Sequence, residues 1–161
     1  MEFSTRPTVL LLDHNSLSRR SLSSHLQKKG CFVIETEQPT GTLQALRERE
    51  VDVVLMSLTT TKEESTITLL RIKEIRPTSE IILMTSPMEI ALSIQCMKLG
   101  AFDDLLVPID LNTLLSRIRA ACEKKQEKDR IKTASAEPLG SEQERKEMIS
   151  GGQDQNRDSH Q

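Results

Sequence analysis

Short runs of apolar residues alternate along this chain with stretches whose apolar residues recur at helical spacing. The runs at 9–12, 51–56 and 81–84 are largely apolar and too short for helices. Such runs predict strands that are covered on both faces, as is typical of a parallel sheet. Two less apolar segments, 31–34 and 102–107, are predicted as further strands.

The stretches between these strands predict helices. The expected helices cover residues 15–30, 39–46, 67–75, 88–99 and the region from 110 onward. Asn15 is a suitable N-cap because its side chain accepts hydrogen bonds from free backbone N–H groups. Gly30 is suited to end the same helix, since glycine readily adopts a left-handed conformation. Strands that alternate with helices in this way predict a doubly wound α/β domain with a five-stranded parallel sheet.

The composition changes near the end of the chain. Beyond Thr133 few large apolar side chains occur. They cannot bury enough surface to offset the entropy lost on ordering the chain. We therefore predict a lead at 1–7, one domain at 8–126, and a helix extension with a disordered tail at 127–161, leaving no room for a fused effector domain.

Composition excludes several classes of function. The net charge is −2, so no basic surface for nucleic acid is expected. Aromatic residues make up 2%, without Trp or Tyr, which argues against base stacking. No stretch resembles a membrane span or a signal peptide, so we predict a cytoplasmic protein that does not contact membranes. The cysteines, Cys31, Cys96 and Cys122, are too scattered for a disulfide framework or a zinc site and are expected to be buried thiols.

Polar residues gather where the predicted strands end. In an open parallel sheet, ligands and chemistry collect at the carboxyl ends of the strands. The residues placed there are Asp13, His14, Glu35 to Glu37, Ser57, Thr85, Ser86, Val107 and Pro108. This edge of the sheet is therefore the candidate functional site.

Four motifs, in order, extend this picture: VLLLDHN, VDVVLMSL, IILMTS and KLGAFDDLLVPID. Together they resemble the receiver domain of bacterial two-component response regulators over about residues 8–125. The resemblance implies a flavodoxin-like fold with strand order 2-1-3-4-5. It also implies phosphoryl transfer from a histidine kinase to an aspartate, assisted by carboxylate-bound Mg²⁺, a lysine and a Thr/Ser hydroxyl.

The acidic side of that family's site is incomplete in this sequence. Asp13 matches the first acid, but His14 stands where the family has the carboxylate that ligates the metal. Imidazole is a poor ligand for the hard Mg²⁺ ion. Ser57 stands at the phosphoacceptor position, where a hydroxyl cannot form an acyl phosphate. We predict that no cofactor binds here and that Mg²⁺ is not held.

The switch side of the site departs as well. Thr85 matches the switch hydroxyl, whereas Asp104 replaces the usual aromatic residue and Val107 replaces the lysine. Losing the nucleophile, one acid and the cation together removes two negative charges and one positive charge, which lessens the repulsion that Mg²⁺ normally relieves. Asp104 would return one negative charge if it pointed into the site. The loop LTTTKEEST also differs from the family's pattern.

These changes predict a pseudo-receiver that keeps the fold and abandons the chemistry. It would be a stand-alone signalling module in a two-component context that binds a protein partner without phosphorylation. The partner would be a histidine kinase or another signalling protein, with a homodimer as a further option. The alternative is a receiver that is phosphorylated on a displaced acceptor, Asp13 or Asp104. A third class, an enzyme on this scaffold, has no visible nucleophile–base pair to support it.

Two residues allow other interpretations. His14 beside Asp13 would suit a softer metal, but no second histidine is placed to join it, so a solvated loop histidine is the preferred interpretation. Ser57 as the target of a serine kinase is disfavoured because it is expected at the bottom of a crevice.

The fourth predicted helix is apolar on two sides. One stripe consists of Ile90, Ile94 and Met97. The opposite stripe consists of Met88, Leu92, Cys96 and Leu99. One stripe should face the sheet, and the second of these is taken as the candidate interaction surface. The alternative is that neighbouring helices cover both stripes.

Overall fold

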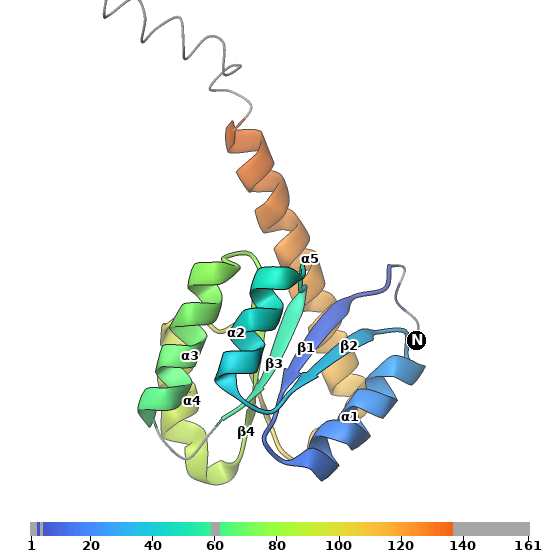
Figure 1. Cartoon of the computed structure of the whole chain (residues 1–161), viewed down its shortest axis with the longest axis vertical. Helices are drawn as coiled ribbons and strands as arrows, with labels where there is room; N and C mark the ends of the chain where they lie inside the picture. The colour runs from blue at the N-terminus through green and yellow to red at the C-terminus, as the bar shows by residue number, and fades with distance from the viewer. Residues whose placement is uncertain (1–2, 4, 59–61, 137–161) are drawn as a thin grey trace, which may run out of the picture. The chain divides into compact units, whose positions relative to one another are not determined.

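The computed structural model describes residues 3, 5–58 and 62–136. Within this part of the chain, five strands alternate with α-helices (Figure 1). The strands are β1 (Thr8–Leu12), β2 (Phe32–Thr36), β3 (Val53–Ser57), β4 (Glu80–Thr85) and β5 (Asp103–Leu106). The helices are α1 (Ser16–Lys28), α2 (Pro39–Glu48), α3 (Lys62–Ile75), α4 (Ile90–Lys98) and α5 (Leu111–Ala136), with a 3-10 turn at Pro87–Glu89.

The strands form one parallel sheet in the order β2-β1-β3-β4-β5. This order confirms the predicted doubly wound, flavodoxin-like fold. The register pairs Leu12 of β1 with Met56 of β3, and Ser57 with Met84 of β4. The carboxyl ends of the three central strands therefore meet at one edge of the sheet.

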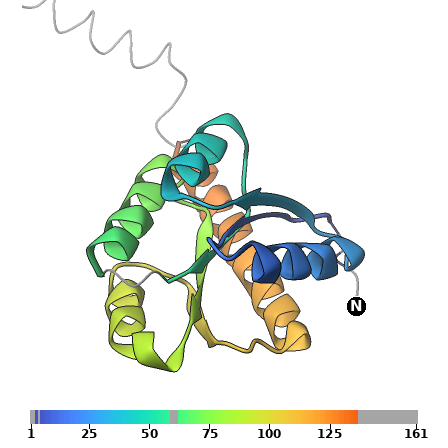
Figure 2. The ribbon, with the colours of Figure 1, turned by 60° about the horizontal axis from the view of Figure 1, so that its bottom comes forward.

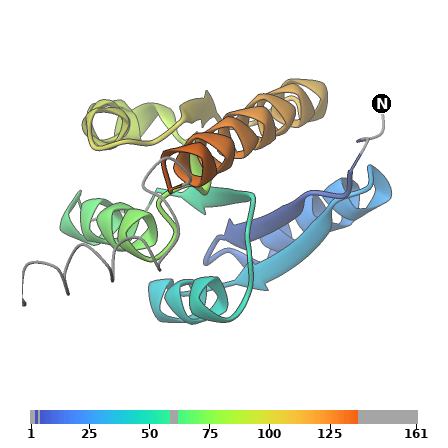
Figure 3. The same ribbon diagram turned by 90° about the horizontal axis from the view of Figure 1, so that it is seen from above.

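Helices cover both faces of the sheet. Alternate residues of a strand point to opposite faces, and the buried side chains accordingly form two cores. One core packs Leu10, Val54 and Leu83 against helices α2, α3 and α4. The other packs Leu11 and Leu55 against α1 and the first turns of α5. Figures 2 and 3 show these two groups of helices on opposite sides of the strands.

Local sequence sets where the helices begin and end. The side chain of Asn15 accepts a hydrogen bond from the backbone N–H of Ser18 at 3.1 Å, so it is the N-cap of α1 as predicted. Gly30 after α1 and Gly100 after α4 have φ values of +97° and +116°, a region that residues with a Cβ rarely adopt. These stops place β2 and β5 directly after their helices.

The C-terminal part differs in one respect from the prediction. Helix α5 continues to Ala136, so the segment from Thr133 to Ala136 is helical and does not belong to a disordered tail. The rest of the predicted tail lies outside the described residues. By its internal contacts the chain divides into two units, Met1–Gln126 and Glu127–Gln161. None of the described helices combines the length and the apolar composition that a membrane span requires.

Candidate functional site

The predicted site residues do meet at the carboxyl edge of the sheet. Asp13 directly follows β1, Ser57 is the last residue of β3, and Thr85 is the last residue of β4. Val107 follows β5 and is joined to β4 by a hydrogen bond from its N–H to the Thr85 carbonyl at 2.9 Å. The parallel topology therefore brings these four positions together, as the sequence predicted.

Asp13 is held by its own neighbourhood. It is 8% exposed, and both carboxylate oxygens accept hydrogen bonds. Oδ1 accepts from the Asn15 N–H at 3.0 Å, and Oδ2 accepts from the Ser18 hydroxyl at 2.6 Å. Hydrogen bonds to the charged form of a carboxyl compensate for its removal from water. Asp13 thus fixes the turn between β1 and α1.

Arg19 is a buried cation beneath this turn. Its Nη1 donates to the Asp13 carbonyl at 2.8 Å, its Nη2 lies 3.0 Å from Oε1 of Glu37, and its Nε lies 3.3 Å from Oε1 of Glu35. The guanidinium side chain is 7% exposed, whereas the two glutamates reach into solvent. Arg19 therefore links β1, α1 and the end of β2 through one planar group whose geometry suits several acceptors at once.

His14 is largely exposed. Its side chain is 69% exposed, and its Nδ1 lies 4.0 Å from Oδ1 of Asp13. In the described ranges, no group of three or more His, Cys, Asp or Glu side chains is arranged to hold a metal ion. The placement of His14 matches a solvated loop histidine.

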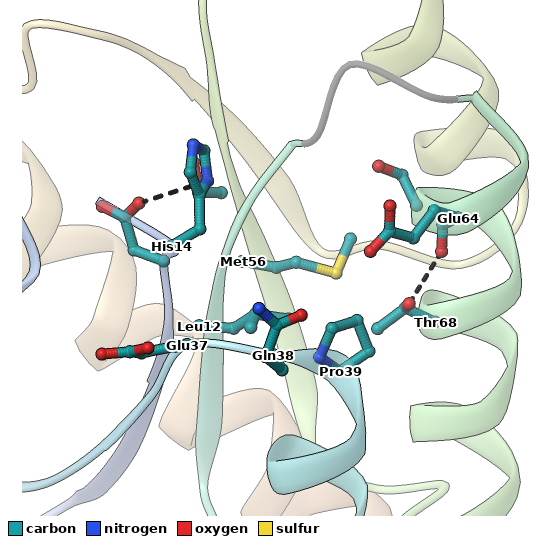
Figure 4. A pocket seen from close by; sticks show the side chains of 11 residues that line it. Leu12, His14, Glu37, Gln38, Pro39, Met56, Glu64 and Thr68 are labelled. Carbon is teal, nitrogen blue, oxygen red and sulfur yellow. Dashed lines mark hydrogen bonds and ion pairs between the residues drawn. The ribbon is translucent and has the colours of Figure 1, made fainter. Parts of the chain in front are cut away.

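Ser57 separates two hollows. The smaller, about 230 Å³, opens toward α2 and α3 and is lined by His14, Met56 and Glu64 among others. Figure 4 shows the Met56 side chain between His14 and Gln38 on one side and Glu64 and Thr68 on the other. The larger, about 630 Å³, opens toward α1 and the start of α5. Asp13, His14 and Ser57 line both, so they form the ridge between them.

The switch side of the site has few polar partners. Thr85 is 2% exposed, and its Oγ1 is a buried hydroxyl without a hydrogen-bond partner in the structure. A buried polar group left in this state costs about 1–3 kcal/mol. Val107 is 42% exposed and lines the larger hollow, where its short side chain offers no charge.

Asp104 does not point into the site. Its Oδ2 accepts a hydrogen bond of 2.7 Å from the hydroxyl of Ser93, a buried residue of α4. It therefore lies on the α4 face of the sheet, where its register partner is Leu83 of β4. The preceding Asp103 pairs with Arg117 of α5 on the other face. Asp104 consequently returns no charge to the site around Asp13 and Ser57.

The match to known proteins agrees with this geometry. Residues 9–119 match the family described as Response regulator receiver domain. The chain belongs to this family. The receiver fold and its place in two-component signalling, which the sequence predicted, are thereby confirmed.

Individual receiver relatives are distant. Transcriptional regulatory protein ZraR of Escherichia coli O157:H7 is 26% identical over 113 residues, which cover 70% of this chain and 26% of that protein. A solved receiver domain protein from Clostridium thermocellum is 26% identical with a TM-score of 0.70, covering 74% of this chain and 97% of that chain. The receiver domain of an HD domain-containing protein from Pseudomonas fluorescens Pf-5 is 25% identical with a TM-score of 0.72, covering 81% and 96%. This chain spans about a quarter of the length of the curated relatives that it matches.

The helix face predicted as an interaction surface needs correction. Cys96 is fully buried, and Leu92 packs against the core beneath α4. Met88 lies in the 3-10 turn before the helix and is 96% exposed, and Leu99 is 37% exposed. The prediction is wrong for Leu92 and Cys96, because α4 turns the side that carries them toward the sheet.

Two exposed apolar residues lie on another side of α4. Ile90 and Ile94 are 47% and 51% exposed. Leu106 of β5 is also exposed and follows Asp104, whose bond to Ser93 ties β5 to α4. Leu106 points to the same face as Asp104, because residues two apart in a strand share a side. Ile90, Ile94 and Leu106 are hereafter called the α4–β5 patch.

The cysteines offer no reactive thiol at neutral pH. Burial raises the pKa of Cys31 to about 11 and that of Cys122 to about 12. Burial also raises the pKa of Cys96. Thiolates are the reactive form, so these side chains act as small apolar groups in the core.

Sequence reasoning missed Arg19 as a member of the site. A signal was available, because Arg19 shares one face of α1 with Leu22 and Leu26 at helical spacing. Leu26 is fully buried and Leu22 packs against the same core. An arginine in the buried stripe of a helix requires partners, and Glu35 and Glu37 were already placed at the same sheet edge.

Proposed function

We propose that this receiver domain signals by binding a protein partner and does not accept a phosphoryl group. One observation carries the proposal: Ser57, a hydroxyl, ends β3 on the ridge where the resemblance calls for an aspartate nucleophile. The surrounding groups support it. Asp13 is already engaged by Asn15 and Ser18, and the described residues lining the two hollows include no lysine or arginine.

Phosphoryl transfer needs the nucleophile, the metal-binding acid and the cation at the same time. Phosphoryl transfer relies on a positioned nucleophile and on cations that neutralise the developing charge. A serine hydroxyl without an adjacent general base is a weak nucleophile. We therefore infer that the site holds neither Mg²⁺ nor a phosphoryl group and that the chain is not an enzyme. Its location in the cytoplasm stays a prediction.

The first test is an intact-mass measurement. The native chain is incubated with acetyl phosphate and Mg²⁺, and no mass increase is expected. A stoichiometric adduct of one phosphoryl group that hydroxylamine removes would contradict the proposal. The matched control is a variant that carries His14→Asp, Ser57→Asp and Val107→Lys. These changes supply the metal-binding carboxylate, the acceptor and the cation, so this variant is expected to take up a phosphoryl group.

The alternative of a displaced acceptor makes its own prediction. If the native chain did gain a phosphoryl group, Asp13→Asn or Asp104→Asn would abolish the gain. The contacts of both residues disfavour this alternative, because Asp13 accepts two hydrogen bonds within its own turn and Asp104 is bonded to Ser93 on the α4 face. Mg²⁺-dependent NMR shifts at Asp13 would favour it, and a flat titration would remove it.

The proposed partner surface is the α4–β5 patch. Association with a partner or with a second copy would bury these exposed apolar side chains. Ile94→Arg should abolish self-association or capture of a histidine kinase, measured by sedimentation and by pull-down. Ile67→Arg is the matched control, because Ile67 on α3 is 52% exposed against 51% for Ile94. Equal loss in both variants would reject the patch.

The tail is tested in the same assay. A pull-down with the full chain is compared with one that lacks residues 133–161. An unchanged result assigns partner binding to the receiver unit.

A further inference from the structure

We propose that the larger hollow beside Ser57 binds a small apolar compound whose polar end donates hydrogen bonds and carries no negative charge. This inference goes beyond the proposed function and does not depend on it. The hollow measures about 630 Å³, which lies within the ~300–1,000 Å³ of typical small-molecule sites. The name ligand cleft is used for it below.

The ligand cleft is built from separate parts of the fold. Helix α1 supplies one wall, β4 supplies Met84 at the base, and the segment from Val107 to Leu114 supplies the other wall. Leu22, Met84 and Leu114 belong to the buried or partly buried core on this face of the sheet. The cleft therefore has a rigid apolar floor, which favours the ring or chain of a ligand by removing it from water.

Two short side chains leave the cleft open. Ser57, the last residue of β3, lines the inner end of the cleft, and Val107 lines its rim. Neither side chain can reach across a hollow of this volume. A longer side chain at residue 107 would fill the space, which gives the proposal a direct test.

The polar groups at the cleft include serine hydroxyls, two histidines and the carboxylate of Asp13. His25 Nδ1 lies 2.7 Å from the Ser21 carbonyl oxygen. A carbonyl only accepts, so Nδ1 is the donor in this bond. The carboxylate of Asp13 lines the same cleft, and each of its oxygens has more than one lone pair.

The charge at the cleft selects the ligand. Among the described lining residues, Asp13 is the only carboxylate, and neither a lysine nor an arginine is present. An anionic ligand would meet the Asp13 carboxylate without a lysine or arginine to offset it. An amine or hydroxyl at the ligand's polar end would instead meet acceptors.

The test uses two probes that differ in their polar end. 2-Phenylethylamine and 3-phenylpropanoate share a ring and a two-carbon linker, but the first is a cationic donor and the second an anion. Each is titrated into the full-length protein while methyl NMR signals of Leu22, Met84 and Leu114 are followed. The amine should give saturable shifts with a dissociation constant on the order of 1 mM, as expected of a fragment-sized ligand. The anion should bind at least about tenfold more weakly.

Two lysine variants make the test specific. Val107→Lys fills the rim and adds a positive charge, so it should abolish the shifts from the amine and increase affinity for the anion. Leu70→Lys is the control, because Leu70 of α3 is 48% exposed and is not among the lining residues of the cleft. It should leave the binding of both probes unchanged. Absence of shifts with the amine, equal binding of both probes, or equal effects of the two lysine variants would overturn the proposal. None of these results bears on phosphoryl uptake, so the two proposals can fail separately.

Discussion

The two sides of the candidate site are built very differently. On the side of β1 and β2, Asp13, Arg19 and the two glutamates form a connected set of hydrogen bonds and ion pairs. On the side of β4 and β5, the Thr85 hydroxyl has no partner among the described residues, and Val107 supplies an apolar side chain. Both sides occupy the same sheet edge, yet only one retains a polar network.

The difference separates structural from chemical roles. The polar groups that remain also hold the chain together, since they fix the turn into α1 and join it to β2. In the resemblance to receivers, the acceptor and the cation serve only phosphoryl chemistry. Ser57 and Val107 stand at these two positions. A residue that also stabilises the fold is harder to replace, because its substitution lowers the stability of the protein.

The largest expected effect concerns the network side. Arg19→Met should lower the free energy of unfolding by about 2 kcal/mol, because the Asp13 carbonyl and the glutamates lose their donor. Urea denaturation followed by circular dichroism measures it. Arg20→Met is the control, since Arg20 is exposed, and it should change stability by less than ~0.5 kcal/mol. Equal effects of the two variants would mean that the network contributes nothing.

A pair of buried threonines compares the two sides directly. The hydroxyl of Thr42 lies 2.7 Å from that of Thr36 and donates to the Gln38 carbonyl at 3.1 Å. Thr42→Val should therefore lower stability by about 1 kcal/mol, whereas Thr85→Val should raise it by up to about 1 kcal/mol by removing an unpartnered hydroxyl. Thermal unfolding of both variants measures the contrast. Destabilisation by Thr85→Val would reveal a hydroxyl with a partner.

A smaller effect is expected at the start of α1. Asn15→Ala removes the acceptor for the Ser18 N–H and should lower stability by about 1 kcal/mol. Asn15→Ser keeps a capping oxygen and should stay close to the native value. Similar losses in the two variants would show that the turn is held by Asp13 alone. The free energy of unfolding in urea provides the measurement.

The smallest effect concerns Ser57 itself. Ser57→Asp brings a second carboxylate to the ridge that holds Asp13, so it should lower stability at pH 7 by about 0.5 kcal/mol relative to Ser57→Asn. Adding Val107→Lys to the aspartate variant should recover this difference. Equal stability of the aspartate and asparagine variants would show that the ridge tolerates a second negative charge.

Periodicity and motif order were enough to predict the fold. The short apolar runs marked the strands, and Asn15 and Gly30 marked the ends of α1. Positions along the chain also sufficed to bring Asp13, Ser57, Thr85 and Val107 to one edge, because parallel strands end on the same side.

Side-chain direction was less accessible to sequence reasoning. The stripe of Leu92 and Cys96 and that of Ile90 and Ile94 are both apolar, and periodicity alone does not say which one faces the sheet. In the observed rotation of α4, the Ser93 hydroxyl donates to Asp104 and Cys96 is buried in the core, and both contacts join residues from different elements. The same holds for Asp104, whose direction depends on that contact.

Arg19 carries one further consequence. A bound metal ion neutralises carboxylates only as far as its concentration allows, and a chelator removes it. The positive charge of Arg19 is covalently attached to the chain that carries Asp13, Glu35 and Glu37. The cation that holds this acidic edge together therefore does not depend on the concentration of a metal ion.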